Sequence, residues 1–214
     1  MIRVAIVDDH PVARQGFRNI IGSRPEFEVV AEAASPDLGL LALSATACDL
    51  VVTDLMMPSD REPDGIFYVK KLGHSHPATG VVVLTACRSA PLLSALLNET
   101  SATVIDKGAP VTELINALFI AANRGRYVSA AVRRLVSQTS IGPGGGGSAT
   151  LSAREVEVLR LILRGTPNHR IAKLFGTSDK TVSAQKGSAM RKLGCRTMTD
   201  LVNAASRLGI SDSA

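Results

Sequence analysis

Five polar residues in the first half of the chain have side chains that together could carry phosphoryl chemistry. Each comes at the end of a short apolar run: Asp8 and Asp9 after IRVAIV, Asp54 after LVVT, Thr85 in GVVVLT, and Lys107 soon after TVI. Clustered carboxylates repel one another unless a cation joins them, and their hard oxygen ligands favour Mg²⁺. A carboxylate beside Mg²⁺ can attack phosphorus and form an acyl phosphate, while the metal, a hydroxyl and an ammonium neutralise the phosphoryl oxygens. The residue types therefore predict an Mg²⁺ site with a phosphate-accepting aspartate.

The elements that must position these residues alternate between strand and helix patterns, which is typical of a parallel sheet with crossover helices. The expected strands are Arg3–Val7, Glu28–Ala33, Leu50–Thr53, Gly80–Thr85 and Thr103–Ile105. The expected helices are Pro11–Ile21, Pro36–Ser44, Gly65–Leu72, Ala90–Asn98 and Thr112–Arg124. The fold class is thus an α/β, doubly wound (βα)5 domain. Ligands of such sheets collect at the carboxyl ends of the strands, where all five polar residues fall.

Each of these residues alone has a simpler explanation. An Asp pair after a strand is often a turn or a helix cap, a Thr at a strand end is usually only that, and a single Lys is usually solvated. Their joint occurrence at the required strand ends favours the functional interpretation.

The motifs VDDH, TDLMMP, VLT and DKGAP resemble the receiver domain of two-component response regulators. The resemblance covers the whole domain and implies a phosphoacceptor at Asp54. It also implies a switch hydroxyl at Thr85 and a phosphoryl-binding ammonium at Lys107. The implied Mg²⁺ site includes Asp54, with Asp9 as a direct ligand, Asp8 acting mainly through water, and Met56 binding through its backbone carbonyl.

The chain departs from the receiver pattern in three places. Val104 stands where many receivers carry an aromatic residue that swings inward when the threonine moves. Asp106 replaces a usual apolar residue, and either pairs with Lys107 or reflects a shifted strand end. The acidic loop Ser59–Asp64, within MPSDREPDG, is longer than the common form and resembles regulators of the Rcs type, which act in capsule synthesis and receive phosphoryl groups through a phosphorelay. A solvated surface loop explains its charges equally well.

A linker is predicted at Ser137–Thr150, where four consecutive glycines and few large apolar residues cannot repay the entropy of ordering. A short helix at Ala130–Ser137 leads into it. Residues 1–149 hold 13 Lys and Arg against 14 Asp and Glu, whereas residues 150–214 hold 11 against 5. The expected division is a receiver domain at 1–124, a connecting helix and linker at 125–150, and a basic domain at 151–214 that could bind a polyanion.

The basic domain is predicted to be all-α with four helices. Ser152 and Glu155 form a capping box before the amphipathic run Ala153–Arg164, with Val156, Leu159 and Leu163 on one face. The other expected helices are Asn168–Phe175, a helix capped by Ser178 that runs to Leu193, and Thr199–Leu208. In the third, Val182, Ala189 and Leu193 should pack against Ile171, Ala172 and Leu174 of the second.

The segment LSAREVEVLRLILRGTPNHRIAKLFGTSDKTVSAQKGSAMRKLG resembles the helix-turn-helix of the LuxR/NarL (FixJ) family, and KTVSAQKGSAMRKLG is again similar to Rcs-type regulators. The face expected to meet base edges in the major groove comprises Lys180, Ser183, Ala184 and Gly187. The residues expected to contact phosphates are Thr181, Gln185, Lys186, Arg191 and Lys192. A glycine inside a helix costs ~1 kcal/mol relative to alanine, so Gly187 either permits close approach to DNA or is drift. An amphipathic basic helix alone is more often a solvated surface.

The leading hypothesis is a transcription factor in which phosphorylation of Asp54 controls dimerisation and binding to double-stranded DNA. The phosphodonor would be a sensor histidine kinase, a phosphotransfer protein or a small acyl phosphate. The expected assembly is a homodimer, or a heterodimer with an auxiliary regulator, and in the family the last helix helps dimerise the domain. Apart from phosphorylation and dephosphorylation of Asp54, no enzyme activity is expected.

Two alternatives stay open. Val104 and Asp106 motivate a phosphate-independent DNA-binding regulator that acts through a heteropartner. A phosphotransferase or phosphatase with an aspartyl-phosphate intermediate would need a second acidic aspartate and a substrate cap, which we do not find in the sequence.

A cytoplasmic location without a membrane partner is expected. The longest apolar runs, such as Val81–Leu84 and Leu92–Leu97, are far shorter than the ~20 residues of a membrane span, and MIRVAIVDDH does not resemble a secretory signal. Three widely spaced cysteines without a CxxC pair suggest neither a disulfide framework nor a zinc site.

Overall fold

A computed structural model describes residues 1–57, 65–139, 151–208 and 210. The chain divides into two compact units, one formed by Met1–Ala86 with Leu97–Arg133 and the other by Cys87–Leu96 with Arg134–Ala214. The loop Ser59–Asp64 and most of the glycine-rich stretch Ser137–Thr150 lie outside the described residues. No helix in the described part of the chain is both long enough and apolar enough to span a membrane.

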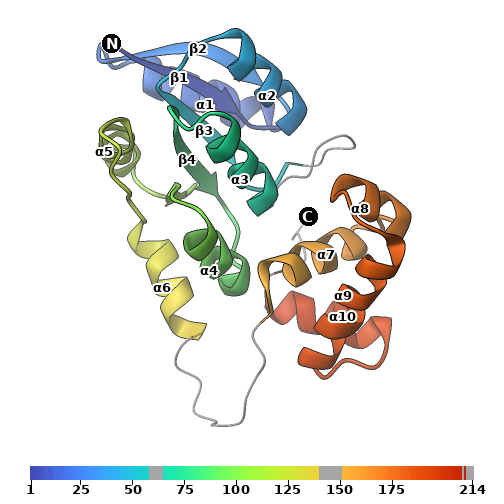
Figure 1. The fold of residues 1–214 in the computed structure, drawn as a ribbon. Coiled ribbons are helices and arrows are strands. Elements are labelled where there is room, and N and C mark those ends of the chain that lie inside the picture. Colours follow the sequence, from blue (N-terminus) through green and yellow to red (C-terminus); the bar gives the residue numbers. More distant parts are fainter. Residues whose placement is uncertain (58–64, 140–150, 209, 211–214) are drawn as a thin grey trace. The chain divides into compact units, whose positions relative to one another are not determined.

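The N-terminal unit is built on a sheet of five parallel strands in the order β2-β1-β3-β4-β5 (Figure 1). The strands are β1 Ile2–Val7, β2 Phe27–Ala33, β3 Leu50–Asp54, β4 Gly80–Thr85 and β5 Thr103–Asp106. Because the strands are parallel, their carboxyl ends lie at one edge of the sheet, and both faces need a covering of helices. This confirms the predicted doubly wound fold.

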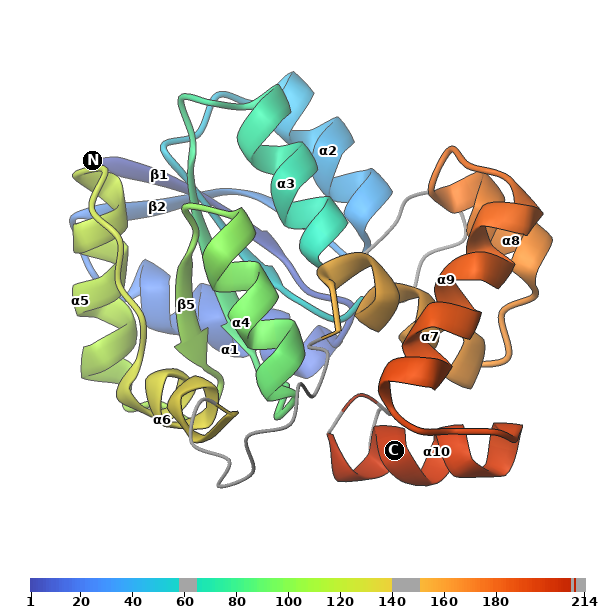
Figure 2. The same ribbon diagram turned by 60° about the horizontal axis from the view of Figure 1, so that its bottom comes forward.

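The helices that alternate with these strands along the chain are α1 Pro11–Gly22, α2 Pro36–Ala45, α3 Gly65–Ser75, α4 Ala90–Glu99 and α5 Val111–Ala122. Successive side chains of a strand point to opposite faces. On β1, Val4 and Ile6 therefore enter the core beneath α1 and α5, whereas Ala5 and Val7 enter the core beneath α2 and α3. Figure 2 shows the two helix pairs on opposite sides of the sheet.

The strand bounds agree with the predicted ones to within one residue, and two differences matter. β3 extends to Asp54 and β5 extends to Asp106. The structure therefore has the shifted strand end that was one of the two explanations for Asp106. Helix α5 ends at Ala122, two residues earlier than predicted. Arg124 adopts a left-handed backbone conformation (φ 60°), which a right-handed helix cannot continue.

After α6 Ala130–Thr139, the remaining helices are α7 Ala153–Leu163, α8 Asn168–Leu174, α9 Asp179–Lys192 and α10 Met198–Arg207. The capping box at the start of α7 has both of its predicted hydrogen bonds. The core of this helical domain contains Val158, Leu161, Ile162, Ile171, Ala172 and Val182. The single apolar face predicted for α7 is only partly right: Val156 and Leu159 are buried, but Leu163 is partly exposed, and Leu161 and Ile162 join the core instead.

Candidate functional site

The predicted carboxylates lie together at the carboxyl ends of β1 and β3. One ligand atom each from Asp8, Asp9, His10 and Asp54 lies within 4.8 Å of the others. Asp8 and Asp54 are buried. His10 is exposed, and its Nδ1 lies 2.8 Å from Asp9 Oδ1 and 3.4 Å from Asp8 Oδ1. His10 is not among the residues predicted for the site, although it follows the Asp pair directly in VDDH.

Lys107 joins the cluster from the end of β5. Its Nζ donates to Asp54 Oδ2 at 2.7 Å and to Asp8 Oδ2 at 2.8 Å. Burial by itself lowers the pKa of Lys107, but the bonds to the two carboxylates outweigh it and raise the pKa above the ordinary value. The ammonium is therefore held in its charged form between two buried acids.

Backbone groups fix the two buried carboxylates. Asp54 Oδ1 accepts from the amide of Leu55 at 2.6 Å and from that of Met56 at 3.4 Å, and Asp8 Oδ1 accepts from the amide of His10 at 2.9 Å. Burial raises the pKa of Asp54 and exceeds the opposing effect of Lys107. The carboxylate is thus oriented by the chain on one oxygen and by the ammonium on the other.

Thr85 completes the row of strand ends. It is fully buried at the end of β4, where it is the register partner of Asp106 in β5. Its backbone oxygen accepts from the amide of Lys107 at 2.9 Å. The side chain of Asp106 accepts from the amide of Gly108 at 2.8 Å, closing the turn after the strand.

The donor set fits a hard divalent cation. One carboxylate oxygen each of Asp8, Asp9 and Asp54 lies within 4.8 Å of the others, slightly more than the ~4.2 Å between opposite oxygen ligands of one Mg²⁺. Met56 lies two residues after the end of β3, and its amide donates to Asp54 Oδ1 at 3.4 Å, so its backbone lies beside Asp54. An acidic pocket of the kind predicted is therefore present.

A second candidate site lies on α9. Lys180, Thr181, Ser183, Ala184 and Arg191 are exposed, Gln185, Lys186 and Gly187 are partly exposed, and Val182 and Ala189 are buried on the opposite side. Ser183 Oγ accepts from Asn168 Nδ2 at 3.1 Å, and the hydroxyls of Ser178 and Thr181 are 2.9 Å apart at the helix start. The predicted separation of an exposed face from a packed face is therefore present.

Lys192 differs from the other residues predicted to contact phosphate. Its Nζ donates to Glu155 Oε2 at 2.7 Å, and Glu155 is buried. The same carboxylate accepts from Ser188 Oγ at 2.7 Å and from the amide of Ser152 at 2.7 Å. Burial opposes ionisation of Glu155, but these bonds outweigh it and lower its pKa to about 2. Lys192 thus links α9 to the start of α7.

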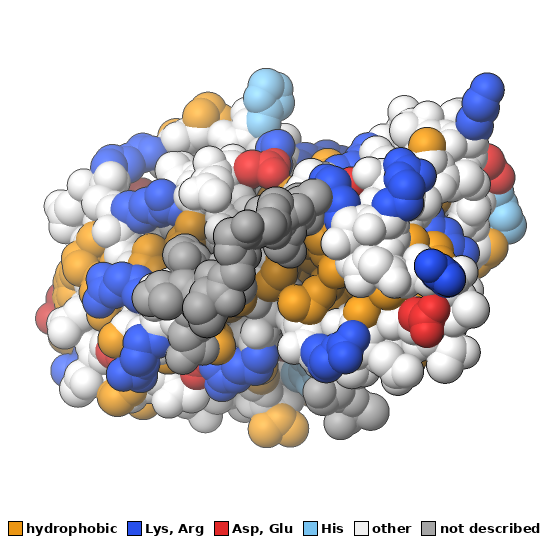
Figure 3. Space-filling view, turned by 90° about the horizontal axis from the view of Figure 1, so that it is seen from below, with side chains coloured by type: hydrophobic (Ala, Val, Ile, Leu, Met, Phe, Trp, Pro, Cys, Tyr) orange, Lys and Arg blue, Asp and Glu red, His pale blue; other side chains and the backbone are white. Residues whose placement is uncertain are grey.

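Helix α8 carries exposed basic residues that are not among the predicted DNA contacts. His169, Arg170 and Lys173 are exposed on α8, the first helix of the helix-turn-helix, which in this motif crosses the DNA backbone. Figure 3 views one face of the molecule, on which Lys and Arg side chains are interspersed with neutral and hydrophobic side chains. The signal that could have found these three residues was the position of α8 in the motif.

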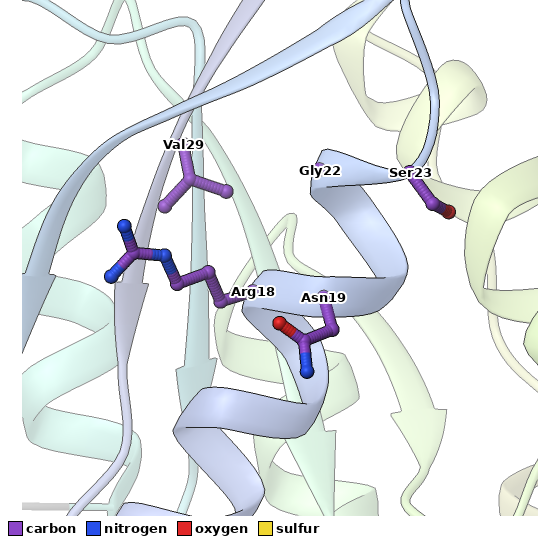
Figure 4. A pocket seen from close by; sticks show the side chains of 5 residues that line it. All are labelled: Arg18, Asn19, Gly22, Ser23 and Val29. Carbon is purple, nitrogen blue, oxygen red and sulfur yellow. The ribbon is translucent and has the colours of Figure 1, made fainter.

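A pocket elsewhere in the N-terminal unit contains none of the predicted site residues. It is lined by Arg18, Asn19, Gly22, Ser23 and Val29, with the side chains of Arg18 and Asn19 from α1 and that of Val29 from β2 (Figure 4). Arg18 is paired with Glu32 at 2.8 Å. The pocket offers no cluster of groups comparable to the acidic site.

Two family profiles match the chain. The response regulator receiver domain matches residues 4–119, and the luxR family of bacterial regulatory proteins matches residues 149–205. The transcriptional regulatory protein RcsB of Escherichia coli strain K12 is 35% identical over 211 residues, covering 98% of this chain and 96% of that protein. The response regulator UvrY of Escherichia coli O6:H1 is 27% identical over 215 residues, covering 100% and 97%.

Solved structures give the same result. RcsB from Salmonella enterica serovar Typhimurium, bound to promoter rprA in the presence of phosphomimetic BeF₃⁻, has a TM-score of 0.81 at 34% identity, covering 96% of this chain and 98% of that one. A structure of the RcsB–DNA complex has a TM-score of 0.78 at 32% identity, covering 95% and 97%. The chain therefore belongs to the two-component response regulators, and its receiver domain and LuxR-type helix-turn-helix make it a DNA-binding transcription factor rather than an enzyme.

Proposed function

We propose that phosphorylation of Asp54 controls dimerisation and DNA binding by this regulator. The observation that carries the proposal is the position of Lys107 Nζ, 2.7 Å from Asp54 Oδ2 and 2.8 Å from Asp8 Oδ2. An oxygen of the Asp54 carboxylate attacks the phosphorus of an acyl phosphate or a phosphohistidine. The bond from phosphorus to the donor oxygen or nitrogen breaks, and its electron pair leaves with the donor. The Lys107 ammonium and the Thr85 hydroxyl then neutralise the phosphoryl oxygens.

Mg²⁺ is the proposed cofactor of this step. Asp9, Asp54 and the backbone carbonyl of Met56 would hold it directly, and Asp8 would act through water. When bound, Mg²⁺ supplies positive charge to the phosphoryl oxygens. The donor is expected to be a sensor histidine kinase or a phosphotransfer protein, which fits a cytoplasmic location and needs no membrane contact by this chain.

For DNA binding we propose that α9 lies in the major groove. Lys180, Ser183, Ala184 and Gly187 would meet base edges, and Thr181, Gln185, Lys186 and Arg191 would contact phosphates. Because Lys192 is bonded to Glu155, we assign it to positioning α9 instead. Support for DNA-bound dimers comes from RcsB, for which a structure of two dimers bound to two parallel DNAs is known.

The proposed domains are 1–124 for the receiver, 125–150 for the connecting helix and linker, and 151–214 for the DNA-binding domain. In this arrangement α10 contributes to the dimer. Met198 and Val202 are exposed apolar side chains on α10, which is the expected character of such a surface. A homodimer, or a heterodimer with an auxiliary regulator, would use this helix.

The proposal is tested by incubating the protein with Mg²⁺ and acetyl phosphate and comparing intact masses of the wild type and Asp54→Asn. A phosphoryl adduct on the wild type alone is expected, together with a dimer that the variant does not form. Phosphoramidate serves as a second donor. An adduct on both proteins, or on neither with either donor, would contradict the assignment of Asp54.

A phosphate-independent regulator acting through a heteropartner is the second candidate. The observation that favours it is Val104, a buried aliphatic residue in β5 where many receivers carry an aromatic switch residue. Equal DNA affinity with and without BeF₃⁻ would select this candidate, whereas a clear difference would select phosphorylation control.

A further inference from the structure

The outer edge of β5, which faces no further strand of the sheet, is paired with a short segment that leads into α6. β5 is the last strand in the sheet order, so its outer backbone groups need partners. The amide of Val104 donates to Tyr127 O at 2.9 Å, and Val104 O accepts from the amide of Ser129 at 2.9 Å. A parallel bridge between Val104 and Val128 lies between these bonds. The segment Tyr127–Ser129 therefore runs alongside β5 as an edge strap.

Ser129 ends the strap and directly precedes α6. Its hydroxyl accepts from the amide of Asp106 at 3.2 Å and from the amide of Val132 at 3.4 Å. Ser129 is 1% exposed, so water does not replace these bonds. A hydroxyl oxygen can accept two hydrogen bonds, and Ser129 Oγ accepts one from the last residue of β5 and one from the first turn of α6. One buried side chain thus joins the two elements.

The β5 end held by Ser129 is the part of the strand that carries Lys107. Asp106 precedes Lys107 directly and is the register partner of Thr85. The Lys107 amide donates to Thr85 O, and its ammonium donates to Asp54. The phosphoacceptor, the switch residues and the start of α6 are therefore connected through successive bonded groups along one edge of the sheet.

We propose that Ser129 is the positioning residue that couples Lys107 to α6, and so carries the phosphorylation state of Asp54 toward the DNA-binding domain. This rests on the proposed function of Asp54. When Lys107 turns from the carboxylates toward a phosphoryl group, the end of β5 shifts, and the shared hydroxyl passes the shift to α6. Rotation of the Val104 side chain cannot transmit this shift, because Val104 is buried and a β-branched side chain is stiff about χ1.

The test measures amide hydrogen exchange of the full chain, with and without Mg²⁺ and BeF₃⁻, in peptides that cover β5 and α6. In the wild type, the phosphoryl mimic is expected to change exchange in both. Ser129→Ala and Ser129→Gly remove the hydroxyl, and glycine is a tolerated N-cap that keeps the start of α6. In both variants β5 should still respond, while the response of α6 falls by a factor on the order of 3 to 30.

Ser129→Thr keeps a hydroxyl and should restore the α6 response. Ser137→Ala is the matched control, because Ser137 is an exposed serine of the same helix whose hydroxyl donates only locally, to Arg134 O. A wild-type α6 response in Ser129→Ala or Ser129→Gly would overturn the coupling role. Intact mass after acetyl phosphate treatment separates the two proposals: a wild type that accepts no phosphoryl group refutes the proposed function itself.

Discussion

Lys107 acts as an internal counter-ion in the acidic site. Its ammonium lies 2.7 Å from Asp54 and 2.8 Å from Asp8, between carboxylates that would otherwise repel one another. A divalent cation that enters the site must compete with this charge for the same oxygens. The ammonium therefore offsets part of the negative charge of Asp8, Asp9 and Asp54 before any ligand arrives.

Lys107→Ala is expected to raise the affinity for Mg²⁺ while weakening the response to BeF₃⁻. Loss of the competing charge should tighten Mg²⁺ binding about tenfold, equivalent to ~1.4 kcal/mol. Calorimetry is the suitable measurement, because the chain has no tryptophan to report binding by fluorescence. Lys70→Ala is the control, since Lys70 pairs with Glu99 on the surface at 2.9 Å. Unchanged Mg²⁺ affinity in Lys107→Ala would refute the competition.

Glu155 should make the stability of the DNA-binding domain depend on pH. Its folded pKa of about 2 lies below the ordinary value, so its contribution is present above pH ~4.5 and is lost as the pH falls toward 2. At neutral pH this contribution amounts to at most about 3 kcal/mol. Urea unfolding at pH 7, 5 and 3 should show a steep loss for the wild type and a flatter profile for Glu155→Gln. Parallel profiles would contradict the assignment.

At the scale of elements, α9 has a glycine where a helix would favour alanine. A Cβ at Gly187 would meet only Arg191 Nη1, at 3.6 Å, which is an ordinary contact. Gly187→Ala should therefore stabilise the domain by about 1 kcal/mol. If α9 approaches DNA at this point, the same variant should bind more weakly to duplexes that the wild type selects from a random pool.

Gly194→Ala provides the contrast, because Gly194 has φ +67° and follows α9. It should destabilise the domain without touching the DNA face. Higher stability of Gly187→Ala with unchanged DNA affinity would mean that the glycine has no role in DNA binding and arose by drift.

The elements were predictable where chemistry is local. Strands such as Gly80–Thr85 read as apolar runs ending in polar residues, and the capping box of Ser152 and Glu155 marked the start of α7. The end of α5 was not predictable, because the left-handed conformation of Arg124 has no sequence signal. The bond of Lys192 to Glu155 and the strap beside β5 were also missed, since periodicity assigns a face but does not identify a distant partner.

At the scale of the molecule, the charge is concentrated where DNA binding is proposed, with 11 Lys and Arg against 5 Asp and Glu in residues 150–214. Affinity should fall steeply with salt, because bound DNA phosphates release counterions. Lys186→Gln should reduce the slope of log affinity against log salt by about 1 per protomer and leave sequence preference unchanged. Anisotropy titrations over a salt series would measure both. A changed preference would move Lys186 to the base-reading face.

The bonds of Glu155 also set a limit on how far the DNA-binding domain can be shortened. Ser152 caps α7, and Glu155 joins that cap to Ser188 and Lys192 near the far end of α9. A fragment that begins at Leu151 retains these hydrogen bonds. A fragment that begins at Arg154 loses the Ser152 cap and leaves Glu155 with fewer hydrogen-bond donors. The smallest fragment that preserves α9, the helix proposed to lie in the major groove, therefore includes Ser152, which lies outside the helix-turn-helix itself.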